Sequence, residues 1–437
     1  MAGIGIGLGL GLGGGGAAAL SEAGVARAIA ARGLSDAQAR AAVGGAATLA
    51  AGLRTVGLLA PAVAATPSPV PVQAPPTGFA LNGSTNAALK AMLARVKAGS
   101  GRGRISIVGD STSVGDGAGS GGGRIAGARP NRPSAVLAGL LTQAGYPALD
   151  NSIYTANVQP SGSTLPAYDP RLALGSWSEQ DPAVAGVFAD FAGSGFLAGG
   201  TGAPLTATFD HVDTFEVSVY DTDSFTLTFR IDGAVPAAGP AAQSFTATSG
   251  TTRLVLKAGA FGSHTLSIAA DSTNAALRSI VAYDSSAPAI DILCHAGCAQ
   301  TSANLAATAA NATRSRDQLA QDGVDVAIVF AGFNDMNQGV SAAAHGASVG
   351  AIIDTQKAHG DVLVVGAWRG SSAAFDNADI RAATAAVAAA KGVAFIDLDA
   401  HYGAAVPPAM YDAVHRTAAG YADVADVYRR CMMAMAG

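Results

Sequence analysis

The sequence predicts a three-layer α/β/α doubly wound parallel sheet, interrupted by an inserted all-β sandwich or jelly-roll domain. Short apolar runs alternate with Ala-rich helical stretches on both sides of the interruption, a pattern typical of a parallel sheet covered on both faces. Between about residues 165 and 288 the helical period disappears and short strands of period two replace it. These patterns predict an α/β domain in two parts, 80–164 and 289–437, with the β domain, 165–288, between its first and second strands.

The α/β part begins with a helix near 85–98. The apolar run Ile105-Ser106-Ile107-Val108 follows as a short buried strand, and a second helix is expected near 133–145. Strands of a doubly wound sheet are buried on both faces, so they are expected as continuous apolar runs. Further strands are predicted at 290–294, 324–330, 362–366 and 393–398.

The inserted segment alternates most clearly at 225–231, where every second residue is Phe, Leu or Ile. This run ends at Asp232-Gly233, a pair typical of turns. Similar short strands fit the runs FEVSVY, SFTATS, TRLVLKAG, SHTLSIAA and RSIVAY. Several short strands with frequent turns favour a sandwich.

The N-terminal residues differ in composition from the rest. Residues 1–60 are rich in Gly and Ala and predict an attachment region, and the Pro-rich residues 61–79 predict a semi-rigid linker. The apolar start lacks the basic residues that precede the apolar stretch of a signal peptide. Its many glycines also weaken a membrane-spanning helix, so neither a signal peptide nor a transmembrane helix is expected.

Composition excludes several classes of protein. Hydrophobic residues make up 49% and charged residues 13%, which is globular rather than disordered. The net charge is -5 and no run of Lys or Arg occurs, so nucleic acid is not an expected partner. Three cysteines make no disulfide framework. Cys294 and Cys298 flank His295, but a fourth ligand for a structural metal is missing nearby, so buried thiols at a strand end are the favoured interpretation.

Three short motifs stand where strands of the predicted sheet end. The motif GDSTS at 109–113 places Ser111 directly after the first strand, and GFND at 332–335 places Asn334 after the strand at 324–330. Near the chain end, Asp412 and His415 stand three residues apart before a predicted helix. Because doubly wound folds build their sites at the carboxyl ends of the strands, these side chains are expected to meet. Each motif alone is common turn chemistry, and only their combination indicates catalysis.

In this order, G-D-S, G-x-N-D and D-x-x-H resemble the motifs of SGNH (GDSL-like) hydrolases, whose core is flavodoxin-like. The resemblance covers about 100–150 and 289–433. It implies a serine esterase with Ser111 as nucleophile, His415 as general base and Asp412 as the residue that orients His415. It also implies an oxyanion hole formed by the Ser111 N–H, a backbone N–H of a second sequence block and the Asn334 side chain.

The second block departs from the family pattern. The family has a Gly shortly after its second strand, whereas this sequence reads CHAGCAQT at 294–301. Register against the following Gln-Thr-Ser places Ala299 at the donor position, with Gly297 two residues earlier. Because the required group is a backbone N–H, Ala can supply it where its backbone angles allow. Ala299 is favoured, and Gly297 stays the alternative.

The expected reaction is hydrolysis of O-acyl esters, with O-acetyl groups of a polysaccharide as the working substrate, and it needs neither metal nor cofactor. The resemblance does not select the acyl group or the alcohol. The inserted β domain favours a carbohydrate, since a sandwich beside a cleft can hold a polymer. The alternative is a glycan-binding head of a phage tail or surface appendage, attached through residues 1–60, in which hydrolysis is secondary or absent. Either way an extracellular, surface or virion location is expected, with an oligomer possible.

Overall fold

The computed structural model divides the chain into two units, Met1–Pro71 and Val72–Gly437. The structure describes residues 74–119, 124–155, 157, 163–180, 196–221, 223–248, 250–307, 315–372, 375 and 377–437. The predicted attachment region, 1–60, and most of the predicted linker lie outside the described residues. Among the helices of the described residues, none is long and apolar enough to cross a membrane.

A seven-stranded sheet forms the centre of the second unit, in the order β1-β16-β15-β14-β2-β13-β3. All neighbouring pairs are parallel except β1 with β16, which are antiparallel. The residues of β14 and β13 are buried throughout, as expected for strands covered on both faces. The doubly wound sheet that the sequence predicts is therefore confirmed. Its strands are β1 Phe79–Ala80, β2 Gly103–Gly109, β3 Ala148–Leu149, β13 Ile290–Ala296, β14 Val326–Phe330, β15 Asp361–Gly366 and β16 Ala394–Asp397.

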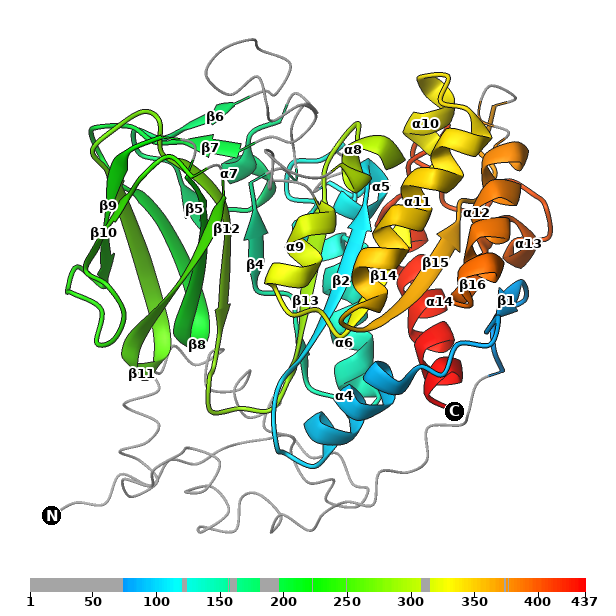
Figure 1. The fold of residues 1–437 in the computed structure, drawn as a ribbon, viewed down its shortest axis with the longest axis horizontal. Helices are drawn as coiled ribbons and strands as arrows, with labels where there is room; N and C mark the ends of the chain where they lie inside the picture. The colour runs from blue at the N-terminus through cyan, green and yellow to red at the C-terminus, as the bar shows by residue number, and fades with distance from the viewer. Residues whose placement is uncertain are drawn as a thin grey trace, which may run out of the picture. The chain divides into compact units, whose positions relative to one another are not determined.

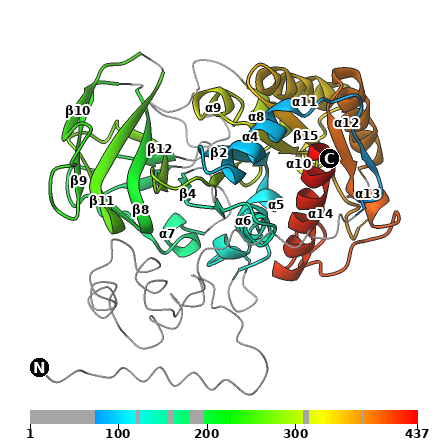
Figure 2. The same ribbon diagram turned by 90° about the horizontal axis from the view of Figure 1, so that it is seen from below.

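Helices cover both faces of this sheet (Figures 1 and 2). Alternate strand residues face opposite sides: Ile105 and Ile107 pack in one apolar cluster, while Val108 packs in another. The first cluster includes residues of α4 Ala87–Lys97, α6 Pro133–Gln143 and α14 Ala418–Ala436. The second includes residues of α8 Ser302–Ala306, α9 Ser315–Gln321, α11 Ala342–Lys357 and α12 Ala378–Lys391.

Nine strands between β3 and β13 form an antiparallel sheet. The sequence predicts the two sheets of a sandwich, whereas these strands share one hydrogen-bonded sheet. The runs TRLVLKAG and SHTLSIAA, expected as two strands, belong to one strand whose register against β8 shifts between Lys257 and His264. The strands are β4 Ser152–Tyr154, β5 Leu172–Ala173, β6 Ser178–Gln180, β7 Phe196–Ala198, β8 Leu205–Tyr220, β9 Phe225–Ile231, β10 Ala242–Phe245, β11 Thr251–Ala270 and β12 Ala276–Tyr283.

The two ends of β8 and β11 have different neighbours. The first half of β8 pairs with β5, and its second half pairs with β12. Only the last five residues of β11, from Leu266, pair with β9. A register shift of this kind bends a strand and increases its local twist, which lets one sheet present two differently paired halves. The domain limits at 165 and 288 stay predictions, and β4, before residue 165, already belongs to this sheet.

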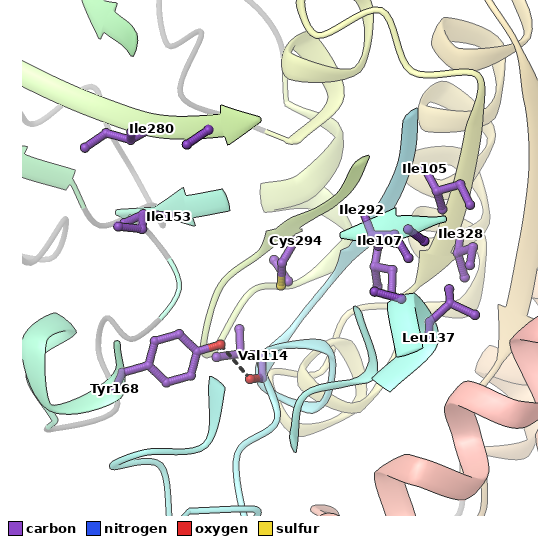
Figure 3. Close-up of a cluster of buried hydrophobic side chains, with 14 of the residues drawn as sticks. Ile105, Ile107, Val114, Leu137, Ile153, Tyr168, Ile280, Ile292, Cys294 and Ile328 are labelled. Carbon is purple, nitrogen blue, oxygen red and sulfur yellow. Dashed lines mark hydrogen bonds between the residues drawn. The ribbon is translucent and has the colours of Figure 1, made fainter. Parts of the chain in front are cut away.

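The apolar core is continuous between the two sheets (Figure 3). Ile107 of β2 and Ile292 of β13 belong to the same buried cluster as Ile153 of β4 and Ile280 of β12. Beside them Tyr168 is buried and donates its hydroxyl to the carbonyl oxygen of Val114, at 2.9 Å. Because Val114 closely follows Ser111 in the chain, this contact connects the packing of the core to the candidate site.

Candidate active site

Ser111 lies at the point where β2 ends and a short helix, α5 Ser111–Val114, begins. Asp110 caps this helix, since its side chain accepts hydrogen bonds from the N–H of Thr112 at 2.9 Å and from the Thr112 hydroxyl at 2.6 Å. Gly115, with φ of 90°, ends the helix in the left-handed conformation that favours glycine. These local bonds hold Ser111 at the carboxyl edge of the sheet. As expected for the residue that closes this turn, Asp110 is fully buried.

His415 and Asp412 approach Ser111 from the loop before α14. The Oγ of Ser111 lies 2.8 Å from Nε2 of His415, and Nδ1 of His415 lies 2.8 Å from Oδ2 of Asp412. The other carboxylate oxygen of Asp412 accepts from the N–H groups of Val414 at 2.8 Å and His415 at 2.7 Å. Since a carboxylate accepts and does not donate, Nδ1 carries the hydrogen, and Nε2 is left to accept from Ser111. The structure thus brings the three predicted side chains into one hydrogen-bonded chain.

Charge around His415 favours its protonated form. Burial lowers the pKa of His415, but its hydrogen bond to Asp412 and the charges of Asp116, Asp412 and Asp110 outweigh burial and raise the pKa above its usual value. Burial also raises the pKa of Asp412, yet its bonds to His415 and Val414 hold that pKa well below the usual range. Asp412 is therefore ionised when His415 accepts a proton.

Asp116 is a second carboxylate beside His415. Its Oδ2 lies 3.5 Å from Nε2 of His415, and its side chain is only 1% exposed. Nε of Arg124 donates to both carboxylate oxygens of Asp116, at 2.8 and 3.0 Å. None of the three motifs includes Asp116, although an acidic residue between glycines shortly after the nucleophile motif is a visible signal in the sequence.

The second block follows β13, the neighbour of β2 in the sheet. The N–H of Gly297 donates to the carbonyl oxygen of Gly109 at 3.1 Å, so this N–H extends the pairing of the two strands. Ala299 is exposed and has φ of 58°, a left-handed conformation unusual for alanine. Its N–H donates to no group among the residues that the structure describes. Of the two candidates, Ala299 is the one whose N–H is left for a ligand.

Asn334 follows β14, the neighbour of β2 on the other side. It lies in α10 Phe333–Asn337, and its Nδ2 donates to the carbonyl oxygen of Gln300 at 3.1 Å. A side-chain amide carries two N–H groups, so this bond orients the amide and leaves a second donor. Gln300 directly follows Ala299, and the bond therefore connects the two predicted oxyanion donors.

Asp335, which follows Asn334, bonds to the start of α8. It accepts from the N–H of Ser302 at 2.9 Å and from the Ser302 hydroxyl. Nδ1 of His345 lies 3.2 Å from Oδ1 of Asp335, and both side chains are fully buried. These contacts connect Asp335 to the start of α8 and to α11.

The Cys294-His295-Cys298 motif does not converge on one point. Nδ1 of His295 lies 2.7 Å from the Ser106 hydroxyl, and its Nε2 lies 2.8 Å from Asp322. The Sγ atoms of Cys294 and Cys298 contact backbone carbonyl oxygens of other residues. All three side chains are buried, as the interpretation of small thiols at a strand end expected.

A serine, a histidine and an aspartate bonded in this order at the carboxyl edge of a doubly wound sheet form the arrangement used by serine hydrolases. Residues 244–422 match the model of the GDSL-like Lipase/Acylhydrolase family. This match, together with the fold, supports an SGNH/GDSL-type hydrolase, a class of carboxylic ester hydrolase. The matched residues include Asn334, Asp412 and His415 and begin within β10, but they do not include Ser111.

The fold is shared with a solved structure of a peptidoglycan O-acetylesterase, with 18% identity and a TM-score of 0.58. That match covers 82% of this chain and 99% of the other, a share that requires the antiparallel sheet as well as the α/β elements. A family two carbohydrate esterase from Cellvibrio japonicus also matches, with 12% identity, 65% and 98% coverage of the two chains and a TM-score of 0.26. One from Clostridium thermocellum matches with 10% identity, 54% and 91% coverage and a TM-score of 0.27. A search of curated protein sequences gave no match.

Proposed function

We propose that this hydrolase removes O-acetyl groups from a polysaccharide, with Ser111, His415 and Asp412 as its catalytic residues. The observation that carries the proposal is the pair of 2.8 Å contacts that join the three side chains across 304 positions of sequence. Ser111 and His415 are each less than a tenth exposed, so their hydrogen bond is little disturbed by water.

The positions of the hydrogens in the Ser111–His415–Asp412 hydrogen bonds determine the steps of the reaction. His415 accepts the Ser111 proton at Nε2 while Oγ attacks the ester carbonyl carbon, and Asp412 stabilises the imidazolium that forms. The negative charge on the carbonyl oxygen is held by the N–H groups of Ser111 and Ala299 and by the Asn334 amide. His415 then returns the proton to the departing sugar oxygen, and acetyl-Ser111 is left. Water then attacks the acetyl carbon while His415 accepts its proton, and His415 returns that proton to the Ser111 oxygen as the bond to acetate breaks.

A polysaccharide substrate is supported by the fold that this chain shares with the peptidoglycan O-acetylesterase. Peptidoglycan is therefore the first polymer to test. Such a substrate also agrees with the additional antiparallel sheet, because ester chemistry alone needs only the doubly wound domain.

The test is acetate release by the purified chain from O-acetylated peptidoglycan and from O-acetylated xylan, beside a long-chain lipid ester. We expect acetate from at least one of the two polymers and none above background from the Ser111→Ala variant. Turnover of the lipid ester with no acetate from either polymer would reject the polysaccharide substrate while keeping the esterase.

A further inference from the structure

Two carboxylates flank the imidazole of His415, one at each nitrogen. Asp412 lies 2.8 Å from Nδ1, and Asp116 lies 3.5 Å from Nε2, the nitrogen that also contacts Ser111. The hydrogen bond to Asp412 places the ring hydrogen on Nδ1, so Nε2 of the neutral ring has no hydrogen to offer Asp116. Once Nε2 has taken the proton of Ser111, the same carboxylate faces a positive charge. Asp116 therefore favours the protonated ring, which is the form that His415 takes after it accepts the proton of Ser111.

We propose that Asp116, held by Arg124, is a positioning residue that stabilises the positive charge of His415 during proton transfer. This inference rests on the proposed function of the same site. It assigns no direct contact with substrate to Asp116, which is 1% exposed.

The chain around Asp116 is fixed from several sides. Its N–H donates to the carbonyl oxygen of Ser111 at 3.0 Å, and its own carbonyl oxygen accepts from the Tyr421 hydroxyl at 2.7 Å. At Gly117, φ is 95°, and a Cβ there would lie 2.6 Å from the carbonyl oxygen of Arg416 and 3.1 Å from Cβ of His415. Only glycine permits this close approach. The backbone thus brings Asp116 against His415 independently of Arg124.

Arg124 fixes the carboxylate itself. Its Nε donates to both oxygens of Asp116, and its side chain is 53% exposed. The positive charge of Arg124 also opposes a second positive charge on His415, but solvent screens it more than it screens the buried Asp116. The two residues therefore act on His415 in opposite directions, with Asp116 the stronger. Three ionisable groups act directly on His415: Asp110, Asp116 and Asp412. Two more, Arg124 and Tyr421, bond to Asp116.

Asp116 and Arg124 should shift the pKa of His415 in opposite directions. A merely structural role of the two residues would not produce such opposite shifts. Asp116→Asn keeps the shape and removes the negative charge, so we expect the pKa of His415 to fall by about one pH unit. Arg124→Met removes the positive charge, so we expect a smaller rise. Because His415 must be neutral to accept the proton, the acidic limb of kcat/KM should move to lower pH in Asp116→Asn and to higher pH in Arg124→Met.

The pKa is measured directly by NMR titration of the protein labelled at its seven histidines, with the His415 signal assigned from a His415→Gln variant. Asp354→Asn, which makes the same charge change in the exposed pair with Lys391, serves as control and should leave the His415 pKa unchanged. An unchanged pKa of His415 in Asp116→Asn, or shifts of the same sign in both variants, would overturn the inference. Because the titration needs no substrate, absence of esterase activity in the wild type would reject the proposed function separately.

Discussion

At the scale of single residues, the site depends on which backbone and side-chain donors remain for a ligand. The N–H of Gly297 donates to Gly109, whereas the N–H of Ala299 donates to no group in the part of the chain that the structure describes. The family motif alone left these two residues as alternatives, because the sequence does not show which N–H the strand pairing uses. The left-handed angle of Ala299 equally has no signal in the sequence, since glycine is the residue normally found there.

Replacing Ala299 should separate the backbone donor from the side chain. Ala299→Gly keeps the N–H and relieves a left-handed alanine, so we expect kcat close to that of the wild type. The opposite change, Ala299→Val, places a β-branched residue where φ is positive and should lower kcat and stability together. Both are measured as ester hydrolysis and thermal unfolding. A large loss of activity in Ala299→Gly would argue against the N–H as the important group.

Asn334 offers the corresponding side-chain test. Removing its amide in Asn334→Ala should lower kcat by about 10²–10³-fold, the usual effect of losing one oxyanion donor. Asn337→Ala, an exposed position in the same helix, is the matched control and should leave kcat unchanged. Equal effects in the two variants would show that Asn334 acts through the helix and not on the oxyanion.

At the scale of elements, the apolar runs predict the parallel strands well, because strands buried on both faces have few polar residues. The same reasoning divides TRLVLKAG from SHTLSIAA, since glycines at 259 and 262 resemble a turn. In the structure they lie at a register shift within β11, and Gly259 has φ of 86°. Local patterns do not distinguish a bulge from a turn, because the partner strand decides which of the two forms.

The buried histidine of β13 provides a stability prediction. His295 is 1% exposed and joins Ser106 of β2 to Asp322, which follows α9. His295→Phe removes both hydrogen bonds and leaves the buried Asp322 carboxylate with its bond from the Tyr154 hydroxyl but without the one from His295, so we expect the free energy of unfolding to fall by about 3 kcal/mol. The exposed His359→Phe should change it by less than about 0.5 kcal/mol. Urea unfolding of both variants measures the difference, and similar values would contradict a structural role for His295.

At the scale of the whole described unit, polar contacts as well as apolar core connect the two sheets. Arg104 of β2 donates to both carboxylate oxygens of Glu216 of β8, at 2.8 Å each. Glu216 also accepts from Arg253 at 2.6 Å and from the Tyr283 hydroxyl at 2.8 Å. Burial raises the pKa of Glu216, but these partners outweigh it and hold the pKa below its usual value. The sequence predicts a parallel sheet and an inserted β domain, but it contains no pattern that pairs Arg104 with Glu216.

This connection should be costly to break. Glu216→Gln leaves Arg104 without its closest charge partner in a setting where both side chains are largely buried, so we expect a loss of about 3 kcal/mol in unfolding free energy. Breaking the exposed pair of Lys391 with Asp354 by Asp354→Asn should cost no more than about 1 kcal/mol. Equal losses in urea unfolding would mean that Glu216 does not hold the sheets together.

The sequence predicts part of the candidate site but not all of it. The motifs predict Ser111, Asp412 and His415 because each follows a strand or precedes a helix at a recognisable place. The motifs do not predict Asp116, because its contact with His415 depends on a glycine turn and on packing between segments far apart in the sequence.

The central claim is that Ser111 is the nucleophile, and labelling by a fluorophosphonate followed by mass spectrometry tests it most directly. Such a reagent reacts with an activated serine and needs no knowledge of the natural substrate. Ser113, buried in the same motif, provides the matched control. We predict a single adduct on Ser111 in the wild type and in Ser113→Ala, and none in Ser111→Ala. Labelling of Ser111→Ala to the same extent as the wild type would contradict the claim.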